Sequence, residues 1–314
     1  MADAQFVAGD WGTSHLRLFL CDADGVALDS STGPGAAEVT GRFASVFSSL
    51  TARWDARHGA LPAVLCGMVG STIGWAEAPY VACPAKPEQI VAACVELPGG
   101  DIRIVPGLSC RNACDAPDFL RGEETQILGA LHLVSALRTG RWLVCLPGTH
   151  TKWVILEDGW VREFLSAPTG ELFALLRDHS VLVRKHDDAD DRTDAESFNK
   201  AVRHCNEFPQ AQVLHRLFEC RGRQLSGEFS AQAASAYLSG LLVASDVNGA
   251  LHALSSYITA RTVYLIGSPE LTQLYASALA SSGYDTFQVD GVAASLAGLS
   301  QVYHQLSQQV AHGI

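Results

Sequence analysis

The most constraining feature of this 314-residue chain is a pattern that occurs twice. An apolar, strand-like run ends in a Gly-Thr turn, and a second apolar run then resumes, at residues 6–20 and again at residues 142–156. The alignment of the two copies places Gly12-Thr13 on Gly148-Thr149, and an Asp-Gly pair typical of a tight hairpin follows in each copy. An internal repeat of this size predicts two similar lobes rather than one large sheet.

The first copy ends its strand on a carboxylate, in the sequence Asp10-Trp11-Gly12-Thr13-Ser14. A turn of this kind offers backbone N–H groups and hydroxyls to an anion, and the carboxylate can hold a divalent cation. We interpret the stretch as a phosphate-binding turn. Taken alone, a purely structural turn between two strands explains it as well.

Composition restricts the classes of partner. With 48% hydrophobic and 18% charged residues, the chain can bury a large core, and its length suits roughly two domains, which we place at 1–139 and 140–314. The net charge of −11 argues against a nucleic-acid or anionic membrane surface. No apolar stretch is long enough to span a bilayer.

The nine cysteines are scattered singly, and no signal-like segment stands at the N-terminus, so we expect reduced thiols and a cytoplasmic location. Two patterns invite a metal interpretation, Cys110-x3-Cys114 and His186-Asp187-Asp188. Neither completes a set of four ligands, and buried thiols and a solvated loop explain them more simply.

The remaining pattern is α/β. Apolar positions with helical spacing occupy 38–57, a strand is predicted at 62–68 and another at Ile102–Gly107, and a helix follows Arg121-Gly122. In the second half we predict a helix over 229–251, in which Gly240 allows a close neighbour, then a strand at 262–267, a helix from Pro269, a strand at 285–289 and a closing helix at 292–306.

Two further segments carry polar groups at the right places for a ligand. The loop Gly67-Met68-Val69-Gly70-Ser71-Thr72-Ile73-Gly74-Trp75 follows a strand, where its backbone can approach a ligand and its aromatic ring can form a wall. A plain connecting loop is an equal alternative. Glu123 and Glu124 stand in the first turn of a helix, a position where acidic residues are common because they complement the helix dipole.

The common nucleotide-binding motifs are missing from the sequence. There is no Gly-x4-Gly-Lys-Ser/Thr loop and no Gly-x-Gly-x2-Gly after the first strand. The duplicated unit with a Gly-Thr turn in each copy instead indicates a two-lobed phosphotransferase.

Several motifs together resemble the 2-dehydro-3-deoxygalactonokinase family, part of the actin-like, ribonuclease H-like ATPase superfamily that includes hexokinase and acetate kinase. The motifs are residues 10–14, Gly67-Met68-Val69-Gly70-Ser71-x2-Gly74-Trp75-x-Glu77-Ala78-Pro79-Tyr80, Arg121-Gly122-Glu123-Glu124-Thr125-Gln126, Leu146-Pro147-Gly148-Thr149-His150-Thr151-Lys152 and Gly267-Ser268-Pro269-Glu270-Leu271. The resemblance implies two duplicated ribonuclease H-like lobes with an ATP cleft between them. It also implies ATP-dependent phosphorylation of the 6-hydroxyl of 2-dehydro-3-deoxy-D-galactonate in D-galactonate catabolism.

The resemblance also implies roles for residues at the phosphate end. Asp10 is expected to hold Mg²⁺, and the transferring phosphoryl group is expected to contact Gly12, Thr13, Ser14 and Arg17. The second phosphate contact is expected from Gly148, Thr149 and Lys152. The adenosine is expected to lie by Gly267, Ser268 and Glu270. Many superfamily members begin the second turn with Asp; Pro147 stands here, so no metal role is expected at that position.

The acceptor end is less fully determined. The base is expected among Glu123, Glu124 and Asp118, with Glu123 ranked first. The substrate carboxylate is expected to meet Arg121 and the loop residues Gly67, Gly70, Ser71 and Trp75.

Two alternatives remain open at this point. A kinase of another sugar or 2-keto-3-deoxy acid, such as the gluconate epimer, would keep both turns, whereas a non-catalytic nucleotide-binding sensor would lose the acidic residues or add a DNA-binding segment. The expected partners are the sugar acid and ATP, with no nucleic acid or membrane, and a homodimer is left open.

Overall fold

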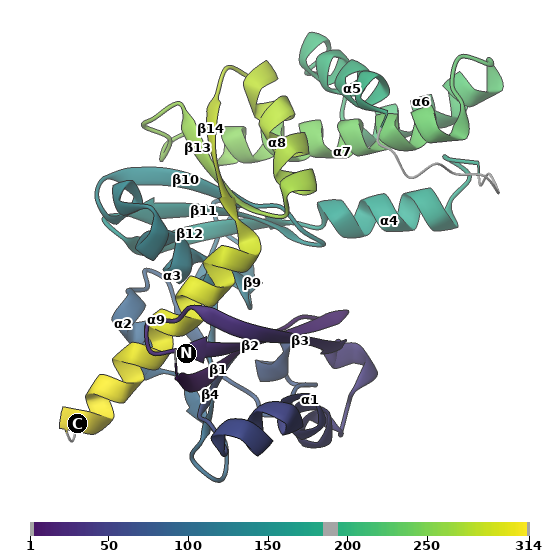
Figure 1. Ribbon diagram of the computed structural model, residues 1–314. Coiled ribbons are helices and arrows are strands. Elements are labelled where there is room, and N and C mark those ends of the chain that lie inside the picture. Colours follow the sequence, from purple (N-terminus) through teal and green to yellow (C-terminus); the bar gives the residue numbers. More distant parts are fainter. Residues whose placement is uncertain (1–2, 185–193, 313–314) are drawn as a thin grey trace. The chain divides into compact units, whose positions relative to one another are not determined.

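The computed structural model describes residues 3–184 and 194–312 (Figure 1). The chain is α/β and forms two compact units. Unit 1 comprises Met1–Gly140, Leu156–Phe164 and Val289–Ile314, and unit 2 comprises Arg141–Ile155 and Leu165–Gln288. His186, Asp187 and Asp188 lie outside the described residues.

Unit 1 is built on a six-stranded sheet in the order β3-β2-β1-β4-β7-β6. Its strands are β1 (Ala4–Trp11), β2 (His15–Asp22), β3 (Ala27–Pro34), β4 (Ala63–Gly67), β6 (Val95–Glu96) and β7 (Ile102–Ile104). The first three strands form an antiparallel meander, and β4 runs parallel to both β1 and β7. Parallel pairing places the ends of β1 and β4 at one edge, where Trp11 pairs with Gly67.

The second sheet repeats this arrangement. Its order is β12-β11-β10-β13-β14, with β10 (Arg141–Leu146), β11 (Thr151–Glu157), β12 (Trp160–Ala167), β13 (Thr262–Gly267) and β14 (Asp285–Asp290). Strand β10 pairs in parallel with β13, as β1 does with β4. The predicted duplication is therefore confirmed at the level of strand order.

Helices and a small sheet complete the two units. The helices are α1 (Phe43–His58), α2 (Pro87–Ala92), α3 (Glu123–Leu133), α4 (Thr169–His179), α5 (Ala195–Glu207), α6 (Val213–Leu225), α7 (Ala231–Ala253), α8 (Pro269–Ser281) and α9 (Gly291–His312), with 3-10 turns η1 (Ala36–Glu38), η2 (Met68–Gly70) and η3 (Ser135–Arg138). A three-stranded sheet has the order β5-β8-β9, formed by β5 (Tyr80–Ala82), β8 (Gly107–Arg111) and β9 (Pro117–Leu120).

One predicted strand is divided. We expected Ile102–Gly107 as a single strand, but β7 ends at Ile104 and Gly107 begins β8 in another sheet. Pro106 explains the break, because a residue without an N–H cannot continue a hydrogen-bonded ladder. The chain thereby changes sheets within three residues.

The C-terminal helix packs with unit 1, against α3 and β1. The ring of Tyr303 stacks on Phe6 at 4.1 Å between centroids. A Cβ atom at Gly298 would lie 2.0 Å from the carbonyl oxygen of Thr125, and one at Gly129 would lie 1.8 Å from that of Ala294. Helices α3 and α9 therefore touch backbone to backbone, which only glycine allows here.

The compact units divide the chain differently from the predicted lobes, 1–139 and 140–314. The first segment of unit 1 ends at Gly140, beside the predicted boundary, but Leu156–Phe164 and the closing helix also pack with unit 1. The backbone bridge between Ala85 and Val161 is one contact that holds the hairpin residues there.

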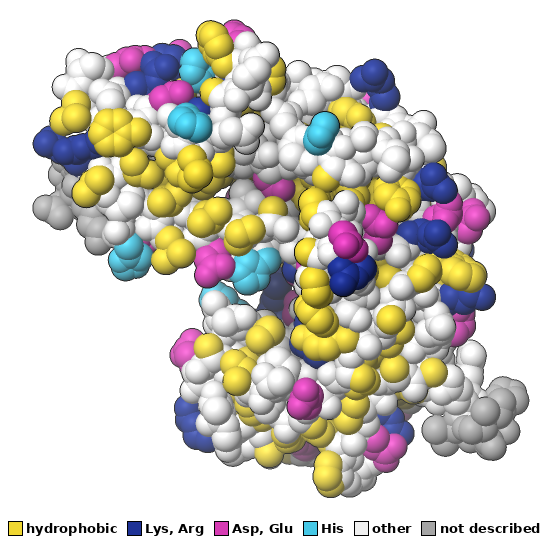
Figure 2. Space-filling view, turned by 180° about the vertical axis from the view of Figure 1, so that it is seen from behind, with side chains coloured by type: hydrophobic (Ala, Val, Ile, Leu, Met, Phe, Trp, Pro, Cys, Tyr) yellow, Lys and Arg dark blue, Asp and Glu magenta, His cyan; other side chains and the backbone are white. Residues whose placement is uncertain are grey.

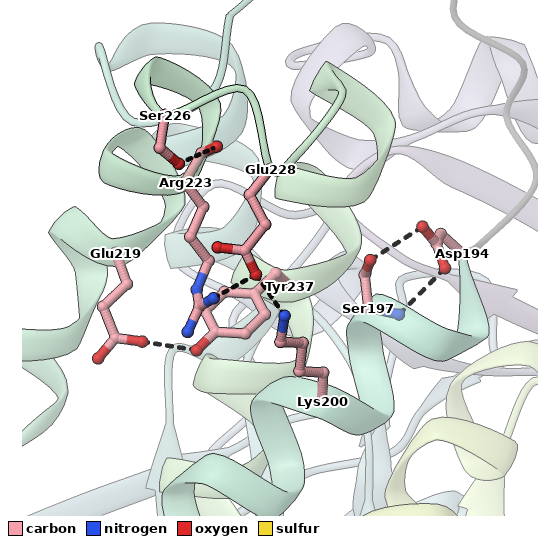
Figure 3. Close-up of polar contacts among 8 residues, drawn as sticks. All are labelled: Asp194, Ser197, Lys200, Glu219, Arg223, Ser226, Glu228 and Tyr237. Carbon is pink, nitrogen blue, oxygen red and sulfur yellow. Dashed lines mark hydrogen bonds and ion pairs between the residues drawn. The ribbon is translucent and has the colours of Figure 1, made fainter.

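The core of unit 2 lies between its sheet and α7, a long helix whose apolar side chains are buried. A Cβ atom at Gly240 would lie 2.4 Å from the carbonyl oxygen of Phe198, which confirms the expected close approach, here of α5. On the outer side, Tyr237 donates a 2.5 Å hydrogen bond to Glu219, while Glu228 pairs with both Arg223 and Lys200 (Figure 3). These contacts fasten α5, α6 and α7 together.

The described surface carries both signs of charge. On the face shown in Figure 2, Lys and Arg are interspersed with Asp and Glu rather than gathered into one basic patch. Among the described helices, none is both long and apolar enough to cross a membrane. All nine cysteines are free thiols.

Candidate active site

The first Gly-Thr turn joins β1 to β2. The N–H of Gly12 donates to the carbonyl of His15 at 2.9 Å, which closes the turn, and the side chains of Thr13 and Ser14 are exposed. Antiparallel pairing sets Asp10 opposite Arg17, and their charged groups approach to 3.5 Å. The hairpin thus brings a carboxylate, a guanidinium and two hydroxyls to one short segment.

The backbone of the turn is held by hydrogen bonds from the segment at η1. The N–H groups of Ala36 and Ala37 donate to the carbonyls of Gly12 and Thr13, at 2.9 and 3.2 Å. A Cβ atom at Gly35 would lie 2.1 Å from the carbonyl oxygen of Thr13, so only glycine permits this contact. The backbone of the turn is therefore fixed while its hydroxyls remain exposed.

Asp10 is largely buried, with 18% of its side chain exposed. Its Oδ1 lies 4.0 Å from the Cys66 sulfur and its Oδ2 lies 3.5 Å from the hydroxyl of Ser295. Burial raises the pKa of Asp10, and Arg17 and Ser295 act in the opposite direction. A bound cation would favour the ionised form further.

The donor set at Asp10 suits Mg²⁺ rather than a transition metal. No group of three or more His, Cys, Asp or Glu side chains able to hold a metal occurs within residues 3–184 and 194–312. Mg²⁺ is commonly held by one or two carboxylates together with water and phosphate oxygens, so a single aspartate beside a phosphate turn fits this ion.

Gly67 connects Asp10 with the start of α3. It has a positive φ of 89°, and a Cβ atom there would lie 2.7 Å from the carbonyl oxygen of Trp11 and 3.6 Å from Oδ1 of Asp10. On its other side, a Cβ atom at Gly122 would lie 3.4 Å from the Cα of Gly67. Two glycines therefore let the acidic first turn of α3 approach the end of β1.

The two glutamates of α3 lie in different surroundings. Glu124 is fully buried; its Oε2 accepts the N–H of Gly122 at 2.6 Å and its Oε1 accepts the hydroxyl of Thr125 at 2.9 Å. Burial, and secondarily the charge of Glu123, raises the pKa of Glu124 to about 8. Glu123 is only partly buried and accepts the N–H of Arg121 at 3.0 Å.

Asp118 belongs to the small sheet. It is buried at 8% exposure, and its two oxygens accept the side-chain amide of Asn112 at 3.1 Å and the N–H of Phe119 at 2.8 Å. Of the three carboxylates predicted as the base, Glu123 is the one that is more than slightly exposed to solvent.

The loop after β4 is held largely by its own contacts. The hydroxyl of Ser71 donates to the carbonyl of Met68 at 2.8 Å, and the ring of Trp75 packs against Trp11 and Phe47. Both side chains thus face the protein. Thr72 and Ile73 are the exposed residues of this loop, and sequence reasoning did not select them because glycine spacing does not indicate which side chains face outward.

Arg121 ties this loop to the start of α3. Its Nη2 donates to the carbonyl of Ala78 at 2.8 Å, and its guanidinium lies 4.3 Å from the ring centre of Tyr80. Among the residues that the structure describes, its buried Nη1 has no hydrogen-bond partner, and a Cβ atom at Gly70 would lie 2.8 Å from it. Gly70 therefore makes room for the guanidinium.

The second Gly-Thr turn, at Gly148-Thr149, is supported in the same way by α4. The N–H of Glu171 donates to the carbonyl of Thr149 at 3.0 Å, and a Cβ atom at Gly170 would lie 2.4 Å from the carbonyl oxygen of Gly148. A glycine and the residue after it thus support this turn, as Gly35–Ala37 support the first. A Cβ atom at Gly148 would lie within 4 Å of no other atom in the described part of the chain.

Lys152 is the second residue of β11, directly after the second turn. Its side chain is buried at 6% exposure, and its ammonium donates to the hydroxyl of Ser166 at 2.7 Å. The positive charge is therefore held within unit 2, where it contributes to the local potential rather than projecting into solvent.

The predicted adenosine segment lies beside the second turn. A Cβ atom at Gly267, the last residue of β13, would lie 3.6 Å from the carbonyl oxygen of Pro147. Ser268 caps α8 by accepting the N–H of Leu271 at 3.4 Å, and Glu270 is exposed in the first turn. Unit 2 thus collects Gly148, Thr149, Lys152, Gly267 and Ser268 at one edge of its sheet.

Comparison with known proteins decides the family. Residues 10–302 match the family model described as 2-keto-3-deoxy-galactonokinase. The chain belongs to this family. The match covers both turns and every predicted site residue, and it confirms the family expected from the motifs.

Relatives within the 2-keto-3-deoxy-galactonokinase family align over nearly their whole length. A protein of Rhizobium meliloti (strain 1021), named a probable 2-dehydro-3-deoxygalactonokinase, is 39% identical over 94% of this chain and 95% of its own. The 2-dehydro-3-deoxygalactonokinase of Escherichia coli (strain K12) is 31% identical over 97% of this chain and 99% of its own.

Solved structures confirm the fold of this family member. A crystal structure from Sinorhizobium meliloti, assigned provisionally as a 2-dehydro-3-deoxygalactonokinase, has a TM-score of 0.86 and 36% identity, and covers 96% of this chain and 99% of its own. A second solved structure is the activator of the 2-hydroxyisocaproyl-CoA dehydratase from Clostridium difficile, with bound ADPNP. It has a TM-score of 0.56 and 11% identity, and the match covers 98% of this chain and 97% of its own. At this identity the likeness shows the fold alone. The chain has the two-lobed actin-like ATPase fold.

Sequence reasoning missed one polar group in this kinase-family chain. Asp246 lies on α7, and its carboxylate accepts hydrogen bonds from side chains next to the second turn. The only signal available was a single carboxylate in a long helical segment that contains no other Asp, Glu, Lys or Arg.

Proposed function

We propose that this protein catalyses the ATP-dependent phosphorylation of the 6-hydroxyl of 2-dehydro-3-deoxy-D-galactonate, in D-galactonate catabolism. The observation that carries the proposal is the matched pair of Gly-Thr turns, each supported from behind by a glycine contact, in a chain of the 2-keto-3-deoxy-galactonokinase family. The nine free thiols support a reducing compartment, and we place the reaction in the cytoplasm.

The phosphate end of the reaction is assigned to both turns. Gly12, Thr13 and Ser14 form the turn that contacts the transferring phosphoryl group, Thr13 and Ser14 offer it their exposed hydroxyls, and Arg17 neutralises charge that spreads over its oxygens. Gly148 and Thr149 contact the remaining phosphates of ATP, and Lys152 adds positive electrostatic potential near them. Gly267, Ser268 and Glu270 lie by the adenosine. Asp10 would hold Mg²⁺, which would supply further charge neutralisation for the phosphates.

The acceptor end is assigned to the start of α3. The 6-hydroxyl oxygen attacks the γ-phosphorus, the bond from that phosphorus to the bridging oxygen breaks, and ADP leaves. Glu123 takes the hydroxyl proton, because it is the candidate carboxylate with an exposed surface, whereas Glu124 and Asp118 are buried and accept hydrogen bonds on both oxygens.

The substrate carboxylate is assigned to the loop after β4 and Arg121. The buried Nη1 of Arg121, which has no hydrogen-bond partner within the described residues, supports this assignment, because such a guanidinium donor favours an incoming carboxylate. Gly67 and Gly70 keep the loop close to Arg121, and Ser71 and Trp75 fix its shape.

The substrate is tested with a panel in a coupled assay for ADP. We expect turnover of 2-dehydro-3-deoxy-D-galactonate to exceed that of its gluconate epimer and of plain hexoses. Preference for the epimer would move the assignment to another 2-keto-3-deoxy acid, and turnover of hexoses alone would overturn it. ATP binding without turnover of any acceptor would favour a nucleotide sensor.

The base is tested by a single substitution. Glu123→Gln is expected to lower kcat by about 10²–10⁴-fold because the amide cannot accept the proton. The change should leave KM for ATP nearly unaltered. Glu88→Gln, an exposed glutamate in the first turn of α2, is the matched control and should retain wild-type kcat. Wild-type kcat in Glu123→Gln would assign the base elsewhere.

A further inference from the structure

Asp246 stands at the meeting point of four elements in unit 2. Its Oδ1 accepts the indole N–H of Trp153 on β11 at 2.8 Å. Its Oδ2 accepts the hydroxyl of Thr169 on α4 at 2.7 Å and that of Tyr275 on α8 at 2.5 Å. The carboxylate of α7 thus receives three side-chain hydrogen bonds, one from each of three other elements.

The surroundings of this carboxylate are among the most buried in unit 2. Thr151 and Trp153 have no exposed surface, Tyr275 is 2% exposed and Thr169 is 7% exposed. Burial raises the pKa of Asp246, although its hydrogen-bond donors oppose that shift. A carboxyl group in such a place costs stability unless it is well hydrogen-bonded, and here the donors offset that cost.

Two of the contacts lead directly to the second Gly-Thr turn. Thr151 is the first residue of β11 after the turn, and its hydroxyl lies 2.8 Å from that of Tyr275. Thr169 directly precedes Gly170, and a Cβ atom at Gly170 would lie 2.4 Å from the carbonyl oxygen of Gly148. Both the strand that leaves the turn and the helix that supports it are therefore attached to Asp246.

The two turns share the glycine contact but differ in the further hydrogen bonds that hold them. At the first turn, two backbone hydrogen bonds from Ala36 and Ala37 fix Gly12 and Thr13, and the indole of Trp11 donates to the carbonyl of Pro34 at 3.1 Å. At the second turn, the backbone bond from Glu171 is supplemented by the side chains gathered on Asp246. The second turn thus depends on a side chain that is distant in the sequence.

We propose that Asp246, acting through Thr151, Thr169 and Tyr275, is a positioning residue for the second phosphate-binding turn. This inference rests on the proposed function, in which Gly148 and Thr149 contact ATP. In this proposal Asp246 acts through those side chains rather than through a contact of its own with the nucleotide. It holds the turn in the geometry that binds the phosphates, because a small displacement of such groups weakens their contacts strongly.

The test compares two buried tyrosines of unit 2 that each donate to a carboxylate. Tyr275→Phe removes a donor to Asp246 and the partner of Thr151, whereas Tyr237→Phe removes the donor to Glu219 on α6. Both changes should lower Tm. We expect Tyr275→Phe to raise KM for ATP at least five-fold with KM for the sugar acid unchanged, and Tyr237→Phe to change neither.

Substitution of Asp246 itself gives the second comparison. Asp246→Ala should raise KM for ATP at least ten-fold. Asp246→Asn should restore KM for ATP to within about three-fold of wild type, because its oxygen can accept the indole N–H and its amide can donate to a hydroxyl. All assays are run well below the Tm of the least stable variant. An equal KM for ATP in Tyr275→Phe and Tyr237→Phe overturns the proposal.

Binding of ADP, measured by calorimetry, separates this proposal from the proposed function. If the wild type binds ADP but phosphorylates no acceptor, the proposed reaction fails, and the loss of ADP affinity in Tyr275→Phe alone still supports the role of Asp246. If the wild type binds ADP and the two tyrosine variants bind it equally well, the role of Asp246 fails while the reaction stands. If the wild type binds no ADP, both fail.

Discussion

At the scale of single residues, the thiol of Cys66 lies between two buried carboxyl groups. Its sulfur is 4.0 Å from Asp10, and burial together with the charges of Asp10 and Glu124 raises the pKa of Cys66 well above its ordinary value. Of the two carboxyls, Asp10 has Arg17 opposite it, whereas Glu124 has Glu123 beside it. The site thus pairs a carboxylate that can hold a cation with a carboxyl that retains its proton.

Asp10→Asn removes the charge proposed to hold Mg²⁺. We expect kcat to fall about 100-fold or more, since the amide cannot replace the electrostatic contact in the transition state. The measurement is a Mg²⁺ titration of phosphotransfer, with Asp24→Asn in the exposed hairpin turn as control. Full activity of Asp10→Asn at saturating Mg²⁺ would show that the metal assignment is wrong.

Glu124 makes stability depend on pH. Its pKa of about 8 exceeds that of an unfolded glutamate, so between about pH 4.5 and 8 the folded chain binds more protons than the unfolded chain. The contribution of this group to the free energy of unfolding is therefore fully present below pH 4.5. It falls as pH rises toward 8, by at most about 1.4 kcal/mol per pH unit.

Glu124→Gln should abolish that slope, because the amide does not ionise but can still accept the N–H of Gly122. Urea unfolding of both proteins across this pH window measures the difference between them. Below about pH 4.5 the difference should be constant, which serves as the internal control. Parallel curves up to pH 8 would contradict the burial of an uncompensated carboxyl at this position.

The sequence predicted on which strands, turns and loops the candidate residues lie, but it did not predict how their side chains are oriented. Asp10, Thr13 and Ser14 follow from a strand that ends in a Gly-Thr turn, because antiparallel pairing leaves few alternatives for their placement. Ser71 and Trp75 face the protein rather than solvent, since the hydroxyl binds a carbonyl within the loop and the indole joins the core of unit 1. Asp246 was not predicted from the sequence, because its hydrogen-bond donors come from distant positions in the chain.

At the scale of elements, the contact between α3 and α9 sets the position of the acidic turn. Gly129 and Gly298 bring the two helix backbones together, so α9 fixes the helix that begins with Glu123 and Glu124. Two helices can approach each other this closely because glycine has no side chain at the crossing point.

Gly298→Ala is expected to lower Tm, because the new Cβ would lie 2.0 Å from a backbone oxygen that cannot move aside alone. The matched control is Gly249→Ala on α7, where a Cβ atom meets nothing within 4 Å. Alanine there should stabilise the helix by about 1 kcal/mol at most. Equal Tm changes in the two variants would argue against the close crossing.

Element types were largely predictable, because strands and helices follow from the period of apolar residues. Strand β13 at Thr262–Gly267 has the predicted bounds, α7 is displaced by two residues at each end, and α9 starts one residue before and ends six residues after the predicted segment. The small sheet β5-β8-β9 was not predictable, since its strands are short and pair with distant partners. The support of the first turn by η1 likewise depends on a contact that local spacing cannot reveal.

At the scale of the whole molecule, unit 1 is assembled from three separate segments of chain. Its last segment, Val289–Ile314, supplies α9, which covers α3 and places Tyr303 on Phe6. A boundary near residue 140 marks where the chain first leaves this unit. It does not mark a complete folding unit, because the core of unit 1 is not closed at that point.

Deletion of residues 291–314 should therefore lower the unfolding temperature of unit 1 by about 10 °C or more, since the apolar faces of β1 and α3 would be exposed. Differential scanning calorimetry of the truncated and full chains measures this. The transition of unit 2, which lacks this segment, is the internal control. An unchanged thermogram would show that α9 contributes little to the unit.

The three-segment construction of unit 1 also has a consequence for biosynthesis. About 150 residues, most of them in unit 2, are translated between Gly140 and Val289, which at roughly 5–20 residues per second takes about 8–30 s. During that interval α3 cannot pack against α9, because α9 has not yet been translated. Unit 1 therefore completes its packing only after Val289–Ile314 has been synthesised, which is after the whole of unit 2.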